Sequence, residues 1–583
     1  MLLRRSRTLL TVILSGALLF VVFSSFPRSD FSDEEISATA NHVPKFSSLN
    51  GLRLPSFRPS IHKPPSPHQD SSDGETKWFS NWAWLHPFSS SITLDENRSV
   101  LPPLPERPYI YTYYSRNKDN GREEDDADSQ LLLAWRRAWY AQGFRPAILG
   151  RGEAMANPLY HSVQNLDLGP ELEEEFFRWL AWGHMGDGLF ADWRCFPMAR
   201  YDHATLSSLR RGPEPDRIVR FDKLGSALFS GRKASINTAL EKAIENIDLS
   251  VKKLVDLLPE DSFETQQTSS LALYDSATIA DFYPALSEKM TTSPAAGRLA
   301  LVELVNSHLQ TTFQNSFPGG ISVLKPFMER STALVEPALR LAKSLSRCPN
   351  SPAPSSCPPN LQKCTPCTQQ KPMKISQPAT YENNTQSFTI GTLPHPYTLV
   401  SLLHGSAEVT TRHIRRDTRR DTWLREVTGK LLPNGLGGGT RAVAFKKAVA
   451  DESAIGTSLW MTVESLPAEA GQALPSSLLD EFEWQLGFKI PRDSEVNVAE
   501  DDSQESLHDP NPSEYGVERE YEIIGEAREM LKKRNNRVDI RSVAEAWNLA
   551  DTEVWRFVKA YRARSIVERK KWEEDEKDFL GLG

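Results

Sequence analysis

Hydrophobic and polar positions change period repeatedly where the folded part of the chain begins. Residues 109–115 (YIYTYYS) are an aromatic run typical of a short strand, and residues 145–150 (RPAILG) predict a second strand. Between them, residues 129–144 repeat apolar side chains at helical spacing, while the acidic residues 123–128 indicate a loop. A strand, a helix and a strand form a βαβ unit, which predicts a parallel sheet with helices on its faces. Ligands of such sheets gather at the carboxyl ends of the strands.

Residues 172–198 predict a further helix followed by an apolar strand. The helix ends at Gly183 or Gly186, and the strand, GLFADW, ends in the carboxylate of Asp192. A metal–diphosphate site requires such a carboxylate, because it coordinates Mg²⁺ or Mn²⁺ and the metal neutralises a leaving nucleotide diphosphate. The alternative is a solvated aspartate at a strand end.

The pattern is less informative farther along the chain. Residues 218–231 contain strand-like apolar runs with glycines, and residues 233–345 have the periodicity of ordinary core-facing helices. Residues 387–400 return to strand and turn character. Residues 411–432 hold six arginines, which could bind the diphosphate of a nucleotide or form a salt-bridged surface helix. His395 and His413 are weak acid–base candidates, each better explained as structural.

The N-terminus predicts the compartment. Residues 9–26 are an uncharged run of 18 residues, close to the length that spans ~30 Å of hydrocarbon. Arg4, Arg5 and Arg7 precede it, so the positive-inside rule leaves the N-terminus cytosolic. We expect an uncleaved signal-anchor, with a cleaved signal peptide as the alternative. The chain is then a single-pass type II protein of the Golgi or ER membrane, with its bulk in the lumen.

Residues 27–107 are rich in proline, serine and charge, and read as an extended, disordered stalk. The aromatic patch between Trp78 and Phe88 is expected to dock onto the folded domain or to serve as a carbohydrate platform. Asn97 and Asn383 begin glycosylation sequons that a lumenal topology would expose to modification.

Composition and charge exclude several classes of protein. Of the 583 residues 39% are hydrophobic, which excludes a wholly disordered chain, and a net charge of −8 argues against a general polyanion binder. Five cysteines exclude a disulfide-dense scaffold. Four of them cluster in a proline-rich loop and could hold zinc, but in an oxidising lumen we favour two disulfides among Cys348, Cys357, Cys364 and Cys367. The fifth, Cys195, is expected to be a buried thiol.

The stretch around Asp192 resembles the DxD-containing sugar transferases of the fungal Golgi and of bacterial capsule synthesis. In that family an acid and an arginine on a helix precede a Gly-Gly turn, an aromatic strand and Asp-x-Asp. The matching positions here are Glu175, Arg178, Gly188, Phe190 and Asp192. The first turn glycine is replaced by Asp187, and the second aspartate by Arg194.

The resemblance covers roughly residues 108 to 232 and implies an α/β fold with a nucleotide-diphospho-sugar transferase (GT-A-like) domain. It implies catalytic roles for Asp192 and Asp187, donor binding by Arg178, Gly188 and Arg194, and Mn²⁺ or Mg²⁺ at Asp192. Asp187 reaches that site only if it lies in the turn. Arg194 has two interpretations: its guanidinium neutralises the diphosphate in place of metal, or the site has lost its metal and only binds, or does neither.

Composition divides the chain into eight parts. They are a cytosolic tail (1–8), the anchor (9–26), the stalk (27–107), the α/β core with a helical insertion (108–346), the Cys/Pro-rich loop (347–377), the continuation of the core (378–490), an acidic linker (491–514) and a charged helical region (515–583). Residues 538–564 have a helix–turn–helix rhythm with a turn near residues 548–550, but the surrounding acids and the lumenal topology argue against nucleic acid.

Two hypotheses follow. The first is a type II membrane glycosyltransferase of the secretory pathway, which transfers a sugar from a nucleotide sugar to a glycan or glycoprotein. The second is a non-catalytic, membrane-anchored lumenal protein that keeps the transferase fold for binding or scaffolding. They differ in whether a further carboxylate or histidine converges on Asp192 in space.

Overall fold

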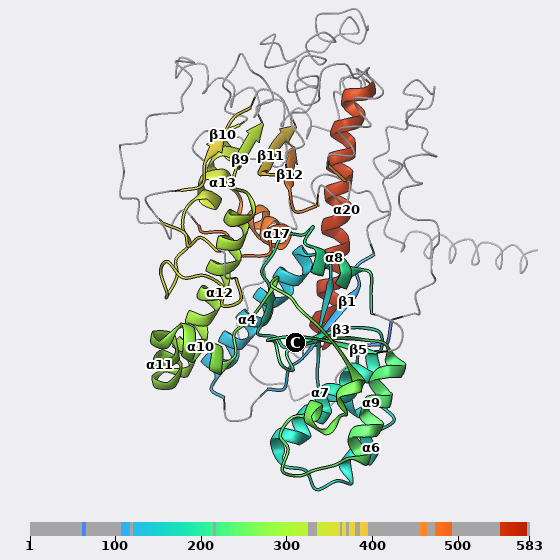
Figure 1. The fold of residues 1–583 in the computed structure, drawn as a ribbon. Coiled ribbons are helices and arrows are strands. Elements are labelled where there is room, and N and C mark those ends of the chain that lie inside the picture. The colour runs from blue at the N-terminus through green and yellow to red at the C-terminus, as the bar shows by residue number, and fades with distance from the viewer. Residues whose placement is uncertain are drawn as a thin grey trace, which may run out of the picture. The chain divides into compact units, whose positions relative to one another are not determined.

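The fold is a mixed α/β architecture of two main sheets with helices against them (Figure 1). The computed structural model describes residues 61–65, 106–116, 120–213, 217–324, 335–361, 364–368, 372–378, 385–393, 449–450, 455–462, 473–492 and 549–579. The α/β class expected from the sequence is confirmed.

The larger sheet has six strands in the order β2-β1-β3-β6-β5-β7. All run parallel except β6, which is antiparallel to both of its neighbours. The strands are β1 (Tyr109–Tyr113), β2 (Arg145–Leu149), β3 (Gly188–Ala191), β5 (Ile218–Phe221), β6 (Leu228–Gly231) and β7 (Phe263–Gln266). The predicted βαβ unit is confirmed, because Tyr109 of β1 pairs in parallel register with Arg145 of β2.

Alternate residues of β1 and β3 face two different hydrophobic cores. Ile110 and Leu189 join the core that holds α4 (Arg122–Ala141), whereas Tyr111 and Phe190 join the core of α7 (Pro170–Met185) and α9 (Lys233–Glu245). Helix α4 leads from β1 to β2 and α7 leads to β3, on the other side of β1. The carboxyl ends of β1 and β3 therefore form a topological switch point, where open α/β sheets bind ligands.

Helix α4 begins earlier than the sequence pattern predicts. The acidic residues 123–128, read as a loop, form its first two turns. Carboxylates near the positive end of a helix dipole are stabilising, so a run of acids here favours the helix start instead of opposing it.

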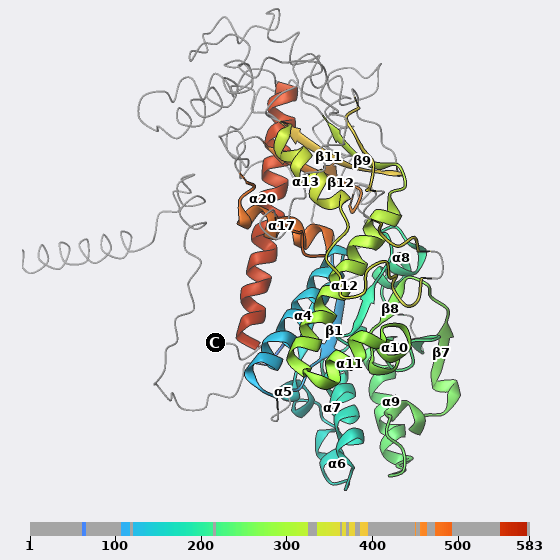
Figure 2. The ribbon, with the colours of Figure 1, turned by 90° about the vertical axis from the view of Figure 1, so that its left-hand side faces the viewer.

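Shorter elements complete this part of the molecule. The two-stranded sheet pairs β4 (Cys195–Pro197) with β8 (Leu271–Leu273) in antiparallel register. The helices are α5 (Arg151–Met155), α6 (Tyr160–Gln164), α8 (Ala204–Arg210), α10 (Ser276–Phe282), α11 (Pro284–Thr292) and α12 (Pro294–Ser316), with 3-10 turns at Leu254–Leu257 and Glu260–Ser262. Helix α12 lies along α4 (Figure 2).

The second sheet is wholly parallel, in the order β10-β9-β11-β12. Its strands are β9 (Gly320–Leu324), β10 (Ile375–Ser376), β11 (Ser387–Leu393) and β12 (Ser458–Thr462), and α13 (Glu336–Ser346) follows β9. Residues 233–345 are largely helical, as the pattern predicts, but the pattern misses β7, β8 and β9. These strands are three to five residues long, too short for their period to stand out among helices.

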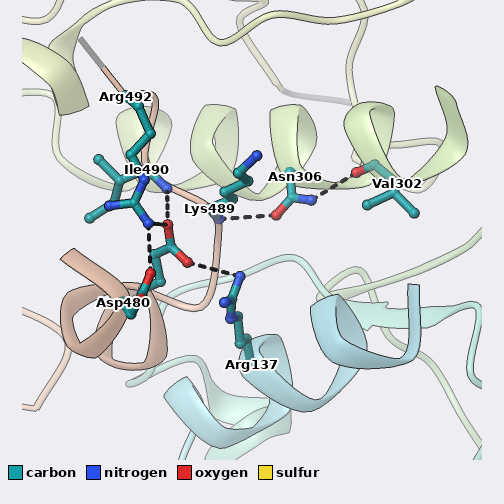
Figure 3. A network of polar contacts seen from close by, with 8 residues as sticks. Arg137, Val302, Asn306, Asp480, Lys489, Ile490 and Arg492 are labelled. Atoms are coloured by element: carbon teal, nitrogen blue, oxygen red, sulfur yellow. Dashed lines mark hydrogen bonds and ion pairs between the residues drawn. The ribbon is translucent and has the colours of Figure 1, made fainter. Parts of the chain in front are cut away.

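Two helices come from the C-terminal third of the chain, α17 (Ser476–Leu486) and α20 (Leu549–Phe579). Glu483 of α17 is 1% exposed and lies between two arginines, with Arg137 of α4 at 2.9 Å and Arg492 at 2.9 Å (Figure 3). It also accepts the backbone N–H of Ile490, and Asn306 of α12 accepts that of Lys489. This network joins α17 to α4 and α12.

The cysteine loop contains the two disulfides expected from the sequence, Cys348–Cys367 and Cys357–Cys364. Buried contacts hold it against the core: the Tyr283 hydroxyl donates to the Cys357 carbonyl, and His308 Nε2 lies 2.9 Å from Ser356 Oγ. Burial lowers the pKa of His308 to about 3, so its ring is neutral. Cys195 is a buried free thiol, as predicted, and burial raises its pKa.

A short piece of the predicted stalk is docked. His62 is 7% exposed and lies between Glu153 of α5, at 2.8 Å, and Glu576 of α20, at 3.2 Å. Burial opposes charging of the ring, but its hydrogen bonds with the two carboxylates outweigh burial and raise the pKa of His62 to about 9. Residues 61–65 thus do not behave as free stalk.

Several predictions fall on residues outside the described ranges. They are the anchor 9–26, the aromatic patch 78–88, the sequon asparagines Asn97 and Asn383, His395, the arginine-rich segment 411–432 with His413, most of the linker 491–514, and residues 515–548. Among the described residues, no helix combines the length and apolar character needed to cross a bilayer.

Candidate functional site

Asp192 follows the last residue of β3 and begins a tight turn. The turn is closed by a hydrogen bond from the Cys195 N–H to the Asp192 carbonyl, at 2.8 Å. The Asp192 side chain accepts the Arg194 N–H through Oδ1, at 2.9 Å, the local pattern that favours aspartate at the start of a turn. The chain therefore places a carboxylate at the carboxyl end of β3, as the sequence predicts, and the turn itself accounts for an aspartate there.

Arg194 and Asp192 form a two-pronged ion pair. Arg194 Nε donates to Oδ1 and Nη2 donates to Oδ2, each at 2.9 Å. Burial opposes ionisation of Asp192, but the charge and hydrogen bonds of Arg194, with a contribution from Arg178, outweigh it and lower the pKa of the Asp192 carboxyl. The pair is ionised, and Nη1 of Arg194 donates no hydrogen bond within the described residues.

Arg178 reaches the same end of β3 from α7. It is ion-paired with Glu175, one turn earlier on that helix, and its guanidinium lies 5.3 Å from the ring centroid of Phe190. Its charge also lowers the pKa of Asp192. Three of the predicted site residues, Arg178, Asp192 and Arg194, are therefore brought together, with Glu175 and Phe190 beside them.

Asp187 and Gly188 lie at the opposite end of β3. Five residue steps along an extended strand separate Asp187 from Asp192, roughly 16 Å. The Asp187 carboxylate instead accepts the N–H of Lys233, at 2.8 Å, at the start of α9. Gly188 has φ +147°, and a Cβ there would lie 3.0 Å from the Tyr109 carbonyl oxygen. Asp187 does lie in the turn before β3, but the turn does not bring it to Asp192. The role that the resemblance implies for it there does not fit this geometry.

A second polar group at this edge has no counterpart in the sequence prediction. Tyr114, just after β1, packs edge-on against Trp193 with ring centroids 5.5 Å apart. Its hydroxyl donates to Asp128 of α4, which also accepts from Arg298 of α12 at 2.8 Å. The aromatic run 109–115 was visible in the sequence, but nothing in it indicates that its last tyrosine meets Trp193.

The donor set at Asp192 does not fit a divalent metal ion. Mg²⁺ and Mn²⁺ need several oxygen ligands, and both Asp192 oxygens already accept hydrogen bonds from Arg194. Within the described part of the chain, no three His, Cys, Asp or Glu side chains form a group that could hold a metal ion. What the edge offers is two guanidiniums and a pair of aromatic rings.

The fold and this edge define the chain as a mixed α/β protein with two ion-paired guanidiniums and two aromatic rings at the switch point of its larger sheet. It belongs to the family described as a domain of unknown function (DUF8765), whose model matches residues 72–583. No curated protein and no solved structure matches the chain.

Proposed function

We propose that the chain is a glycosyltransferase-like protein of the secretory pathway. It binds a nucleotide-diphosphate sugar at the carboxyl ends of β1 and β3. The observation that carries the proposal is the convergence of Arg178, Arg194 and Asp192 at this switch point, where sheets of this kind bind nucleotides. The resemblance of residues 108 to 232 to the DxD sugar transferases supports the same donor.

In this proposal the site works without metal. Asp192 is a positioning residue: its two oxygens fix the plane of the Arg194 guanidinium and leave Nη1 to donate to a phosphate oxygen. Arg178 adds a second positive charge. Guanidiniums stabilise the charge that develops on a diphosphate when the sugar–phosphate bond breaks. In the DxD sugar transferases the second aspartate and its metal perform this task.

The aromatic side chains at the edge provide for the nucleotide base. Trp193 lies between Asp192 and Arg194 in the turn and is only partly buried, and Tyr114 supports it edge-on. An exposed indole face stacks on any base, which places the base beside the two arginines that hold the diphosphate.

The compartment is also a proposal. We propose a single-pass type II protein anchored by residues 9–26, with Asn97 and Asn383 glycosylated in the lumen of the Golgi or ER. Two disulfides in the cysteine loop support this setting, because such bonds persist in oxidising compartments.

A second function is favoured by one specific observation. No second carboxylate or histidine bonds to the Asp192 side chain among the described residues, and Asp187 is at the other end of β3. A site with two guanidiniums but no general base suits a non-catalytic lumenal binding protein, which would hold a nucleotide sugar without transferring the sugar.

Binding of a panel of nucleoside diphosphates and nucleotide sugars to the full-length chain in detergent tests the proposal, with Mn²⁺ and with EDTA. We expect saturable binding that EDTA leaves unchanged and that Arg194→Ala weakens at least tenfold. Arg217→Ala, an exposed arginine with no ion pair among the described residues, is the matched control. Absence of binding to every nucleotide by the folded chain would overturn the donor site. Binding without release of sugar from any donor would favour the non-catalytic alternative.

A further inference from the structure

A cavity of about 2040 Å³ opens at the amino edge of the six-stranded sheet, the edge opposite Asp192. Tyr109, Arg145 and Gly188, the first residues of β1, β2 and β3, form part of its wall. So do Arg232 and Lys233, which follow the antiparallel strand β6 and therefore emerge at the same edge. The end of α4 and one side of α20 line it as well.

The lining is strongly cationic, although the whole chain carries a net charge of −8. Among the described residues that line the cavity, ten are lysine or arginine and four are aspartate or glutamate. The ten are Arg107, Arg145, Arg200, Arg210, Arg211, Arg232, Lys233, Arg562, Arg569 and Lys571. A local excess of one sign inside a low-dielectric wall concentrates its field, so the cavity attracts anions even though the chain as a whole does not.

Five of these ten cations already pair with carboxylates or carbonyl groups of the fold. Three arginines pair with carboxylates outside the lining, as Arg200 does with Asp202 and Arg569 does with Glu573. Arg107 and Arg210 donate to carbonyl groups at the end of α4, where a helix leaves its last acceptors unpaired. These side chains have structural roles and do not by themselves indicate a ligand.

Five other cations pair with no carboxylate of the described residues, although Lys233 Nζ donates to the His184 carbonyl at 3.2 Å. They are Arg145, Arg211, Arg232, Lys233 and Lys571. Arg145 is the most constrained of them. Its Nε is buried without a hydrogen-bond acceptor, and its guanidinium lies 5.0 Å from the ring centroid of Tyr109. A guanidinium with a buried N–H that lacks an acceptor is costly, and the charge of an anion bound beside it would offset part of that cost.

The start of α9 carries positive side chains, although negative charge is favourable at this end of a helix. Arg232 is its N-cap and Lys233 its first residue, and its first turn contains no acid. Positive side chains at the positive end of a helix dipole are unfavourable, whereas an anion there is favourable. Asp187 offsets part of this by accepting the Lys233 N–H, but two cations remain against one carboxylate.

The strand order sets the separation of the two cationic positions. Arg145 begins β2 and Arg232 follows β6, with β1 and β3 between them. Three strand spacings separate them, roughly 14 Å. Tyr109 and Gly188 begin the two intervening strands, and Gly186 and Asp187 precede Gly188 in the lining.

We propose that this cavity binds a ligand with at least two phosphate or sulfate groups, one beside Arg145 and the other beside Arg232 and Lys233. The shared chemistry is that of a multiply charged, tetrahedral oxyanion ligand. A phosphorylated small molecule and a sulfated glycan both present it. This cavity site is separate from the proposed donor site at Asp192 and does not depend on it, since the two sites lie at opposite ends of the same strands.

Calorimetric titration of the full-length chain in detergent tests this, with three probes: inositol hexakisphosphate, a heparin tetrasaccharide and inorganic phosphate. We expect micromolar or tighter binding of one multivalent probe, weakened by salt, and binding of inorganic phosphate at least tenfold weaker. The multivalent probe that binds identifies phosphate or sulfate as the natural group.

The variant R145Q/R232Q should lose at least tenfold in affinity, and the matched pair R217Q/K289Q, which removes the same charge from exposed sites elsewhere, should not. If R145Q/R232Q fails to fold, R232Q/K233Q alters exposed residues alone and carries the same expectation. Arg178→Ala should bind as the unaltered chain does. No saturable binding of either multivalent probe, or an equal loss in the matched pair, would overturn the proposal.

Discussion

Arg194 donates to both carboxylate oxygens of Asp192, two residues before it in the same turn. Arg194 thus occupies both oxygens of the carboxylate to which the sequence resemblance assigns a metal ion. The same geometry leaves Arg194 Nη1 without a hydrogen bond among the described residues. A ligand at this edge would meet the Arg194 guanidinium.

Removal of Arg194 should destabilise the chain more than removal of the pair. Arg194→Ala leaves the Asp192 carboxylate, 14% exposed, with one of its three hydrogen bonds, and should lower the free energy of unfolding by about 2–3 kcal/mol. Asp192→Asn with Arg194→Ala should recover part of that loss. Urea unfolding of the two single variants and the double variant measures the coupling, and strictly additive losses would contradict an interaction between the two side chains.

The ion pair of Asp192 with Arg194 also predicts how the stability of the protein changes at low pH. Because the pKa of Asp192 is lowered from its ordinary value of 3.8, its contribution to stability is complete above pH 3.8 and is lost as pH falls through the lower, folded pKa. Acid unfolding of Asp192→Asn should therefore depend less on pH below 3.8 than that of the unaltered chain. Asp281→Asn, an exposed aspartate on α10, serves as the control; equal slopes in all three proteins would contradict the prediction.

Glu483 should be among the most sensitive positions outside the sheet. Glu483→Ala leaves the Arg137 guanidinium and the Ile490 N–H without their acceptor and removes one of the two carboxylates that pair with Arg492, which should cost about 3–5 kcal/mol of unfolding free energy. Asp480→Asn alters a carboxylate that is 57% exposed and pairs with the same Arg492, and should change stability by less than about 0.5 kcal/mol. Chemical denaturation of both variants checks the difference, and similar losses would mean that the network in Figure 3 does not hold α17 in place.

The sequence was sufficient where local pattern and long-range structure agree. The βαβ unit at residues 109–150, the strand that ends at Asp192 and the disulfide chemistry of the cysteine loop all follow from period, turn residues and composition. The acidic start of α4 was misread because acids suit both a loop and the first turn of a helix, and only the packing of α4 on the sheet decides between them.

The candidate site was predictable only in part, because convergence depends on strand direction. A motif read along the chain places Asp187 and Gly188 five and four residues from Asp192, yet a four-residue strand carries them to the opposite edge of the sheet. Tyr114 and Asp128 reach the site from β1 and α4, and no spacing in the sequence indicates their meeting with Trp193 and Arg298. Residues 387–400 predict strand character where β11 lies, but its pairing with β9 and β12 could not be predicted, since long connections separate these strands.

Closure of the cysteine loop should contribute measurably to stability. Cys348→Ser with Cys367→Ser opens a link between residues 19 apart, and a loop of that length predicts a loss of about 3 kcal/mol from chain entropy. The Cys357–Cys364 link spans only seven residues and should contribute less. Thermal unfolding of the two paired variants ranks them, and the reverse order would show that contacts such as that of His308 with Ser356, and not chain closure, set the stability of the loop.

The raised pKa of His62 predicts that the protein loses stability as the pH becomes alkaline. Its folded pKa, about 9, lies above the ordinary value of 6.5, so its contribution is complete below pH 6.5 and is lost as pH rises through 9. The shift corresponds to about 3 kcal/mol, since each pKa unit is worth about 1.4 kcal/mol. Calorimetry between pH 6 and 9 should show a falling unfolding temperature that His62→Gln removes, whereas the exposed His161→Gln keeps it. A curve for His62→Gln that falls as steeply as that of the unaltered chain would mean that residues 61–65 are not held to α5 and α20 by this charge.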